Sequence, residues 1–161
     1  YRKKIAQPSI RIKGKAITLV SYSYMFMETL KAANILKEHN IMCEVIDLNT
    51  LRPLNLKKII TSIKKTKKLL FIDNGYSDFG IGSEVISKLV NILPKKNNYI
   101  LDKIGLPSYP VPSTRKLAEL CYLNYENIIN KIVKITKSKK INFKRKNMES
   151  DIPNLSFTGP F

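Results

Sequence analysis

The sequence predicts an α/β domain whose sheet is mainly parallel and is covered by helices on both faces. Short apolar, β-branched runs alternate with longer segments whose apolar residues recur at helical spacing. Alternating strands and helices favour parallel pairing, because each helix returns the chain to the same edge of the sheet. The 161 residues suffice for one domain with a substantial core, and no solenoid repeat is visible.

Four strands are predicted, and a helical region follows each of them. The strands are short apolar runs that end at polar or glycine-containing turns, namely residues 17–22, 43–48, 69–73 and 99–104. Ser23 is expected to cap the first helix, whose inward stripe consists of Phe26, Leu30, Ala33 and Leu36.

The second helix has the clearest stripe. Asn55 can cap it, lysines take its outer face, and its inward residues are Leu56, Ile59, Ile60 and Ile63. Burying each of these side chains contributes about 1.5–3 kcal/mol, so docking on the sheet rather than intrinsic propensity holds the helix. The substitution Ile60→Asp is therefore expected to undock it.

Two further helical regions follow the third and fourth strands. One begins near Ile81 and is closed by Pro94, with Val85, Ile86, Leu89, Val90 and Leu93 facing inward. The last helical region is expected to begin with Leu117, Leu120 and Cys121 and to be continued by Ile128, Ile129, Ile132 and Ile135.

The composition argues against several classes of function. The formal net charge is +17, but the cations are 24 lysines and five arginines, whereas nucleic-acid recognition favours the arginine fork interleaved with aromatic side chains. Nucleic-acid binding is therefore disfavoured, and it would be concentrated in residues 137–146, for which a solvated linker is the favoured interpretation. No apolar run of about 18 residues is present, so no membrane contact is expected and a cytoplasmic location is predicted.

Few residues are suited to catalysis or metal binding. Cys43, in a strand, and Cys121, in a helix, are predicted to be buried thiols, and His39 lies at a helix end. Asp47 and Asp73 lie near carboxyl ends of strands, where open α/β sheets place ligands. No acid, base or metal ligand accompanies them, so hydrogen bonds to loop amides are the favoured role.

Two loops remain as candidate sites. Residues 75–82 form a glycine-rich strand-to-helix turn that could hold an anion, but they lack the dinucleotide and P-loop spacings, so a tight turn and close helix packing at Gly80 and Gly82 are favoured. In the other loop, Pro53 favours an extended backbone conformation at Arg52, which fixes the direction in which the Arg52 side chain leaves the chain. Two roles are open for Arg52, namely an ion pair with a carboxylate of its own domain and a contact with a partner across an interface.

Several segments, in this order, resemble the C-terminal domain of the transketolase superfamily. They are Ile17-Thr-Leu-Val-Ser-Tyr-Ser, Glu44-Val-Ile-Asp-Leu-Asn-Thr-Leu-Arg-Pro-Leu, Phe79-Gly-Ile-Gly-Ser-Glu, Gly105-Leu-Pro-Ser-Tyr-Pro-Val-Pro-Ser and Leu123-Asn-Tyr-Glu-Asn-Ile-Ile. The resemblance spans residues 1–136 and is closest to the β subunit of thiamine-diphosphate-dependent 2-oxoacid dehydrogenases.

This resemblance implies a three-layer α/β/α fold with about five strands, one of them antiparallel. It divides the chain into four parts. Residues 1–15 are a connector from a missing upstream pyrimidine-binding domain, 16–136 are the transketolase C-terminal-like domain, 137–150 are a basic linker and 151–161 are an apolar docking tail.

The resemblance also implies a function for the parent protein, namely decarboxylation of a 2-oxoacid through thiamine diphosphate and Mg²⁺ with acyl transfer to a lipoyl carrier. In that family the C-terminal domain assembles subunits and does not hold the cofactor. No catalytic, cofactor-binding or metal-binding residue is therefore carried over. Expected partners are a second copy or an α subunit, together with the lipoyl acyltransferase. The expected interface residues are Leu51, Arg52, Pro53, Gly80, Gly82, Phe157 and Phe161.

Alternative functions are open. The parent could be a transketolase or a deoxyxylulose-phosphate synthase, which the sequence upstream of Tyr1 would decide. A basic module that binds nucleic acid or another anion would show binding that weakens steeply with salt. A nucleotide-binding regulatory module would place its ligand at residues 75–82.

Overall fold

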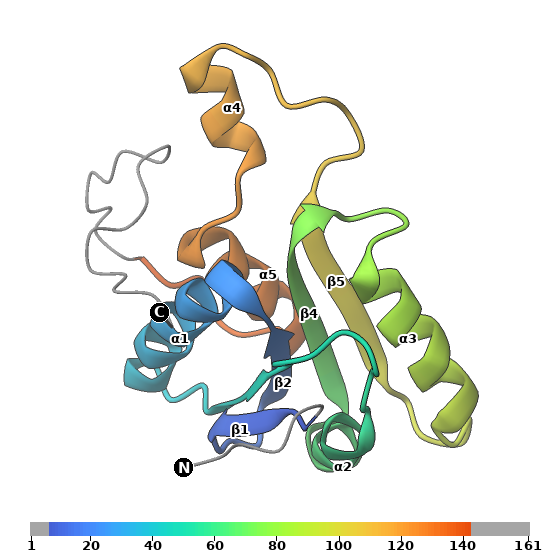
Figure 1. Ribbon diagram of the computed structural model, residues 1–161. Helices are drawn as coiled ribbons and strands as arrows, with labels where there is room; N and C mark the ends of the chain where they lie inside the picture. Colours follow the sequence, from blue (N-terminus) through green and yellow to red (C-terminus); the bar gives the residue numbers. More distant parts are fainter. Residues whose placement is uncertain (1–6, 143–161) are drawn as a thin grey trace, which may run out of the picture.

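A five-stranded sheet in the order β1-β3-β2-β4-β5 forms the centre of the fold (Figure 1). The computed structural model describes residues 7–142, apart from the side chains of Arg115 and Glu119. The strands are β1 (Ser9–Ile12), β2 (Ile17–Ser21), β3 (Cys43–Asp47), β4 (Lys68–Tyr76) and β5 (Ile100–Leu106). The helices are α1 (Ser23–Glu38), α2 (Lys57–Thr66), α3 (Ile81–Ile92), α4 (Arg115–Cys121) and α5 (Tyr125–Thr136).

The sheet is mixed. β2, β3, β4 and β5 pair in parallel, and β1 pairs antiparallel with β3. The predicted mainly parallel sheet with one antiparallel strand is therefore confirmed. The antiparallel strand lies within residues 1–15, which were predicted as a connector, so part of that segment belongs to the domain. Arg11 Nε lies 3.7 Å from Asp47 Oδ2 and links the two strands.

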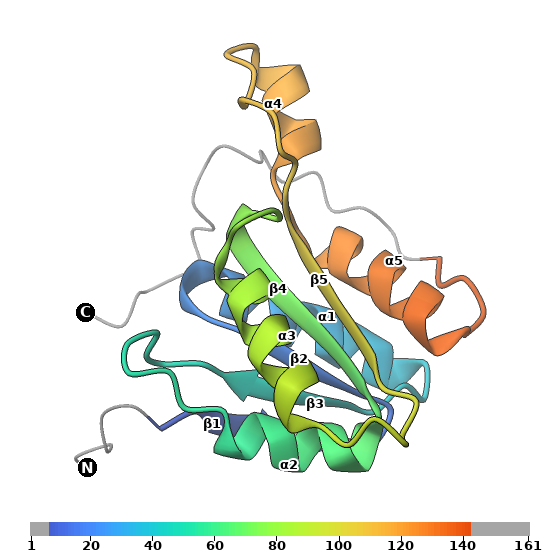
Figure 2. The ribbon, with the colours of Figure 1, turned by 90° about the vertical axis from the view of Figure 1, so that its right-hand side faces the viewer.

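Helices cover both faces of the sheet (Figure 2). α1 and α5 pack on one face, and α2 and α3 pack on the other. Consecutive residues of β4 pack in opposite layers of the core, because side chains point alternately to the two faces of a strand. Leu70 and Ile72 join the layer of α1 and α5, whereas Leu69 and Phe71 join the layer of α2 and α3.

β4 is longer than predicted. The dipeptide Asn74-Gly75 indicated the end of the strand, but pairing with β5 resumes at Tyr76 after a shift of register. Glycine at position 105 makes this possible, because a Cβ there would lie only 2.7 Å from the carbonyl oxygen of Gly75. The extended β4–β5 ribbon carries the following loops beyond the rest of the sheet (Figure 1).

The final helical region, predicted as a single one, consists of two helices, and the second begins within the segment Leu123-Asn-Tyr-Glu-Asn-Ile-Ile. The side chain of Asn124 accepts hydrogen bonds from the amides of Glu126 at 2.9 Å and Asn127 at 3.2 Å, and Asn127 Oδ1 accepts from the Asn124 amide at 3.0 Å. This capping box starts a new helix. α5 buries its four isoleucines as predicted, but Leu117 and Leu120 of α4 are exposed.

The buried stripes of the other helices differ from the predicted ones at single positions. In α1, Phe26 and Leu30 are half-buried and Met25, Thr29 and Ala32 are buried instead. Tyr22 rather than Ser23 is the N-cap, without a side-chain hydrogen bond. Asn55 Oδ1 does accept from the Lys57 amide at 3.1 Å. Ile60 in α2 is half-buried, and Val90 in α3 is exposed.

The stretch predicted as a basic linker begins on the domain itself. Ile141 is buried and joins the core layer of α1 and α5. Lys137, Lys139 and Lys140 are exposed. The other basic residues of this stretch and the predicted tail, with Phe157 and Phe161, lie outside the described residues.

Cys43 and Cys121 are buried free thiols, as predicted. Burial raises the pKa of Cys43 to about 12, which keeps this thiol protonated and unreactive near neutral pH. Within residues 7–142, no cluster of three His, Cys, Asp or Glu could hold a metal ion. No helix in the same range is both long and apolar enough to cross a membrane.

A buried carboxylate in β3 links α2 to the turn between β1 and β2. Glu44 in β3 is 2% exposed, and its Oε2 accepts from Lys65 Nζ and, at 3.4 Å, from the Gly14 amide. Burial raises the pKa of Glu44, but hydrogen bonds from Lys65, Ser62 and the Gly14 amide lower it, and the net pKa lies below the ordinary value. The charged form is therefore stabilised by folding.

Glu44 is expected to contribute to stability only where it is ionised. Because its pKa is lower in the folded chain, this contribution is complete above the ordinary glutamate pKa of about 4.3 and is lost as the pH falls through the folded-state value. Glu44→Gln should lower the unfolding free energy at pH 7 by about 1.5–3 kcal/mol, the usual contribution of hydrogen bonds to a charged group. In urea titrations the difference from the wild type should shrink toward pH 3. A difference that does not change with pH would contradict this role.

Candidate functional site

The carboxyl ends of four parallel strands lie at one edge of the sheet (Figure 1). From β2 the chain passes to β3 on one side and later to β4 on the other side. Open α/β sheets place ligands at such a change of direction. The surface made by the loops that follow β2 to β5, together with α4, is called the strand-end face below.

Asp73 is buried at this edge, and one of its carboxylate oxygens helps to hold the fold. Its Oδ1 accepts from the Tyr22 hydroxyl at 2.6 Å and from the Gly75 amide at 3.0 Å. Burial, followed by the hydrogen bond to Asp73 and its charge, raises the pKa of Tyr22 well above the usual tyrosine value, so the phenol remains a donor. Asp73 therefore makes the predicted loop-amide contact and also ties β2 to β4. Asp47 is paired with Arg11 and is likewise structural.

The glycine-rich turn is closed by the chain itself. A Cβ at Gly80 would lie 2.5 Å from the carbonyl oxygen of Tyr76, and one at Gly82 would lie 3.0 Å from Phe71 Cδ1. Gly82 is buried where α3 packs against β4. The predicted tight turn and close helix packing are confirmed. Gly82 itself offers no surface to a partner in this fold.

Lys103 lies at the glycine-rich turn, a position that was not predicted from the sequence. It extends from β5 to the turn, where its Nζ donates to the carbonyl oxygen of Ser77 and to Ser83 Oγ and lies 3.8 Å from Asp78 Oδ1. Asp78 also accepts from Ser108 Oγ. The lysine that could have attracted a phosphate is thus used to hold the turn. The only signal in the sequence is a single lysine within a half-buried strand.

A second buried carboxylate positions α5. Glu28 in α1 is 4% exposed, and its carboxylate accepts from Lys31 Nζ at 2.7 Å and from the Tyr125 amide at 3.0 Å. Tyr125 is the first residue of α5, so the negative charge lies at the positive end of that helix dipole. Burial and then Glu28 raise the pKa of Tyr24. These contacts tie α1 and α5 together rather than forming a reactive pair.

Arg52 lies in the loop that leaves β3 for α2, at the same edge of the sheet. Its side chain is exposed, as is Pro53, while Leu51 packs against the core layer of α2 and α3. Arg52 forms no ion pair with any described side chain of residues 7–142. A clamp inside the described domain is therefore excluded, and contact with a partner stays a prediction for Arg52.

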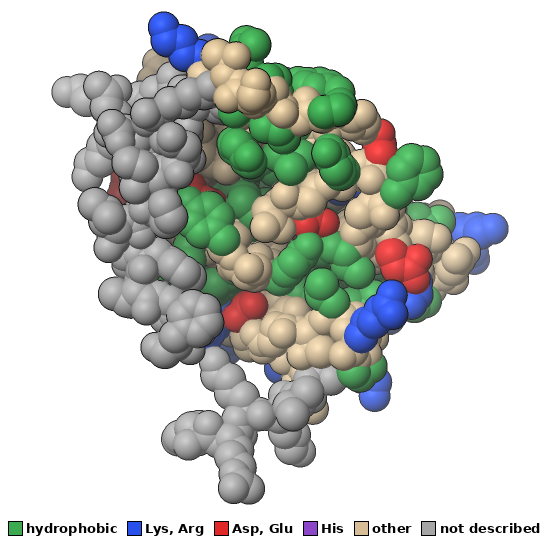
Figure 3. Space-filling model, turned by 45° about the horizontal axis from the view of Figure 1, so that its top comes forward, with side chains coloured by type: hydrophobic (Ala, Val, Ile, Leu, Met, Phe, Trp, Pro, Cys, Tyr) green, Lys and Arg blue, Asp and Glu red, His purple; other side chains and the backbone are tan. Residues whose placement is uncertain are grey.

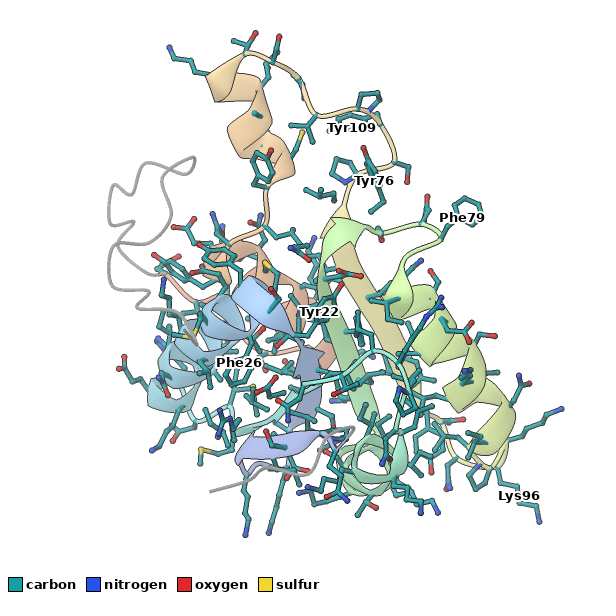
Figure 4. All side chains as sticks on the ribbon, in the orientation of Figure 1. Tyr22, Phe26, Tyr76, Phe79, Lys96 and Tyr109 are labelled. Atoms are coloured by element: carbon teal, nitrogen blue, oxygen red, sulfur yellow. The ribbon has the colours of Figure 1, made fainter. Side chains whose placement is uncertain are left out.

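The strand-end face exposes large apolar side chains instead of reactive groups. Figure 3 shows hydrophobic side chains gathered over this end of the molecule. Figure 4 shows three of these side chains. Tyr76 and Tyr109 lie close to one another, and Phe79 points away from the sheet and its helices. Phe79 is fully exposed.

Comparison with known proteins accounts for this architecture. The family model for "Transketolase, C-terminal domain" matches residues 7–128. The chain belongs to the transketolase C-terminal domain family. A pyruvate dehydrogenase E1 β subunit of Dictyostelium discoideum, named as mitochondrial, is 29% identical over 140 residues, which are 87% of this chain and 39% of that protein. The corresponding subunit of Rickettsia bellii is 32% identical over 123 residues, 76% of this chain and 38% of that protein.

A solved structure has the same fold. It is a split-gene transketolase described as an inactive β4 tetramer, with a TM-score of 0.71 and 21% identity, and the match covers 87% of this chain and 44% of that one. The resemblance seen in the sequence is thereby confirmed. This transketolase C-terminal domain spans about two fifths of the length of the curated relatives it matches.

The described residues of this transketolase C-terminal domain do not fit thiamine diphosphate or Mg²⁺. Backbone atoms occupy the space inside the glycine-rich turn, and Lys103 is bound to the turn. Asp73 Oδ1 already accepts hydrogen bonds from the Tyr22 hydroxyl and the Gly75 amide. No acidic cluster suited to a metal ion occurs in the described range. No reaction step is therefore assigned to these residues.

Proposed function

We propose that this chain is the C-terminal assembly domain of the β subunit of a thiamine-diphosphate-dependent 2-oxoacid dehydrogenase. The parent enzyme would oxidatively decarboxylate a 2-oxoacid and pass the acyl group to a lipoyl carrier. The pyruvate dehydrogenase β subunits among the relatives support this assignment. The observation that carries it is the strand-end face, where the polar groups hold the fold and apolar groups are left exposed.

This division of roles follows from the chemistry of the face. A catalytic group must be free to bind or exchange a proton with a substrate, but Asp73 and Lys103 are both held by neighbouring groups. Exposed apolar side chains are suited to contact another protein. The domain therefore supplies packing surface, and thiamine diphosphate and Mg²⁺ are assigned to other parts of the enzyme.

The partners proposed for this surface are a second copy or an α subunit, with docking of the lipoyl acyltransferase as a further role. Relatives occur both as bacterial subunits and as subunits named mitochondrial, so the cytoplasmic location stays a prediction. A transketolase parent is the runner-up, because the family model and a solved structure carry that name. The curated relatives favour the dehydrogenase.

A chimaera tests the proposed function. Residues 7–136 of this chain would replace the matching segment of the pyruvate dehydrogenase E1 β subunit of Rickettsia felis, which is 30% identical over 129 residues. The assembled enzyme is expected to decarboxylate pyruvate in the presence of thiamine diphosphate. A chimaera that folds and assembles with its α subunit but has no activity would overturn the assignment.

Arg52 is expected to strengthen subunit association. An exposed guanidinium without a partner inside the described domain is available to a carboxylate across an interface. Arg52→Ala should raise the dissociation constant for self-association about tenfold in sedimentation experiments, because arginine is enriched among the few interface residues that contribute most to binding. Lys96→Ala is the matched control, because Lys96 lies at the opposite end of the molecule (Figure 4). An unchanged constant for Arg52→Ala would remove Arg52 from the interface.

A further inference from the structure

The end of the sheet at which the four parallel strands begin lies opposite the strand-end face (Figure 1). It is called the basic end below and consists of residues 13–16, 37–42, 64–68, 92–100 and 134–142. Lys131 Nζ lies 2.8 Å from Asp102 Oδ2. This ion pair holds the second half of α5 beside the start of β5 and so brings the last of these segments to the basic end.

The basic end has a large excess of exposed positive charge. Its segments contain 13 lysines and no arginine, and Glu38 is their single acidic residue. All of the lysines are exposed except Lys68, which is half-buried. Within residues 7–142, the pair of Lys65 with Glu44 is the only ion pair that these lysines form. The 13 are Lys13, Lys15, Lys37, Lys64, Lys65, Lys67, Lys68, Lys95, Lys96, Lys134, Lys137, Lys139 and Lys140.

Helix dipoles account for only part of this charge. Cations near a helix C-terminus interact favourably with the partial negative charge there. Four of the lysines lie in the last turns of helices, namely Lys37, Lys64, Lys65 and Lys134. In contrast, Lys13 and Lys15 lie in the β1–β2 turn, and Lys95 and Lys96 follow α3, whose last turn has no basic residue. These two pairs have no structural role in the described domain that requires a positive charge.

Exposed aliphatic side chains lie among the lysines. Met42, just before β3, is 44% exposed. Ile92, the last residue of α3, is 54% exposed, and Ile100, the first residue of β5, is 42% exposed. The basic end therefore presents apolar groups and ammonium groups side by side.

This combination indicates which anionic partner the basic end suits. Protein interfaces are depleted of lysine and enriched in arginine, and nucleic-acid recognition likewise favours the arginine fork. An anionic lipid surface attracts lysine as strongly as arginine, because its diffuse charge requires no fixed hydrogen-bond geometry. Aliphatic side chains can also enter its headgroup region. A surface with many lysines, no arginine and exposed aliphatic groups therefore favours lipid.

We propose that the basic end binds the surface of an anionic phospholipid membrane, with its lysines at the headgroups and with Met42, Ile92 and Ile100 in the headgroup region. The expectation of no membrane contact rested on the missing spanning run, and a contact at the lipid surface needs none. In this orientation the strand-end face points away from the lipid and stays accessible to the partners proposed for it. The proposal goes beyond the proposed function and does not depend on it.

Co-sedimentation of the full 161-residue chain with large unilamellar vesicles tests this proposal. The chain is expected to bind vesicles of phosphatidylglycerol and phosphatidylcholine at about 0.1 M salt, to bind much less to phosphatidylcholine alone, and to bind less as added salt screens the charges. K95Q/K96Q should lower the partition coefficient about 25-fold, because each lysine near an anionic lipid surface contributes about fivefold. Circular dichroism should show an unchanged fold, since both side chains are exposed.

K57Q/K58Q is the matched control. Lys57 and Lys58 are also adjacent and exposed, but they lie at the start of α2, about 15 Å along the helix axis from the basic end. This distance exceeds the Debye length of about 10 Å at 0.1 M salt, so the partition coefficient should change less than about twofold. Equal weakening in the two variants would overturn the proposal, because net charge rather than the basic end would then attract the lipid.

The aliphatic side chains provide a second measurement. I92Q/I100Q leaves every charge in place and should lower the partition coefficient about tenfold, because polar groups replace apolar ones in the headgroup region. V90Q is its control, since Val90 is 55% exposed on α3 but lies outside the basic end. An unchanged partition coefficient for I92Q/I100Q would overturn the insertion of these side chains.

Two further outcomes would overturn the proposal. One is a wild-type chain that does not bind the phosphatidylglycerol vesicles. The other is a chain that binds a DNA duplex more tightly than these vesicles and loses that binding in K95Q/K96Q, which would assign the basic end to nucleic acid. The experiment does not use enzyme activity, so its failure leaves the proposed function standing, and an inactive chimaera leaves the lipid contact standing.

Discussion

Ile59→Asp is expected to abolish cooperative folding of the chain at 25 °C. Ile59 is fully buried where α2 meets the sheet. Removing its side-chain contacts costs about 2–5 kcal/mol, and a carboxylate without a partner in the same place adds several more. Since typical domains are stable by only about 5–15 kcal/mol, this sum approaches or exceeds the whole stability of the fold.

The neighbouring residue supplies the control. Ile60 is only half-buried, so a carboxylate there can reach water, and Ile60→Asp should cost about 1–2 kcal/mol and leave the chain folded. Far-UV circular dichroism and urea titrations of the two variants distinguish the positions. Equal loss of stability in both variants would contradict the observed orientation of α2.

Gly14→Ala is expected to lower the unfolding free energy by about 3 kcal/mol, the upper end of the usual cost of overpacking. A Cβ at this position would lie 2.2 Å from the carbonyl oxygen of Met42 and 2.3 Å from the carbonyl carbon of Cys43. The Met42 oxygen cannot easily move, because it accepts from the amides of Lys15 at 2.9 Å and Ala16 at 3.0 Å. The β1–β2 turn would therefore have to separate from the start of β3.

Gly75→Ala is the matched control for Gly14→Ala. A Cβ at Gly75 would have its nearest neighbour, Asp73 Oδ1, at 3.5 Å, which is an ordinary contact. We expect a change of less than about 1 kcal/mol in urea titrations of this variant. A loss at Gly14 no greater than that at Gly75 would show that the turn yields without cost.

The central strands and their helices could be predicted because they are buried on both faces. A continuous apolar run such as residues 43–48 is typical of a strand covered on both sides, and a clear stripe such as that of α2 is typical of a helix docked on a sheet. The stripe did not distinguish Ile59 from Ile60, however, because both positions fall within the width of one apolar face. The structure gives Ile59 and Ile63 the fully buried positions.

The missed features depend on contacts between distant residues. β1 is a short edge strand with Arg11 among its residues, so its sequence reads as a polar connector until β3 lies beside it. Lys103 acquires its role only when β5 brings it to the turn after β4. Leu117 and Leu120 of α4 were predicted to begin the last helical region because they are apolar at helical spacing, and both are exposed. Spacing alone cannot reveal whether the surface that covers such residues belongs to the same chain.

This domain is proposed to supply contact surface and to have no reaction centre among its described residues. Isothermal titration of the purified chain with thiamine diphosphate in the presence of Mg²⁺ tests it most directly. The expected result is no measurable heat of binding, with the chain shown to be folded by its urea transition in the same buffer. Stoichiometric binding of thiamine diphosphate by the chain alone would contradict the claim.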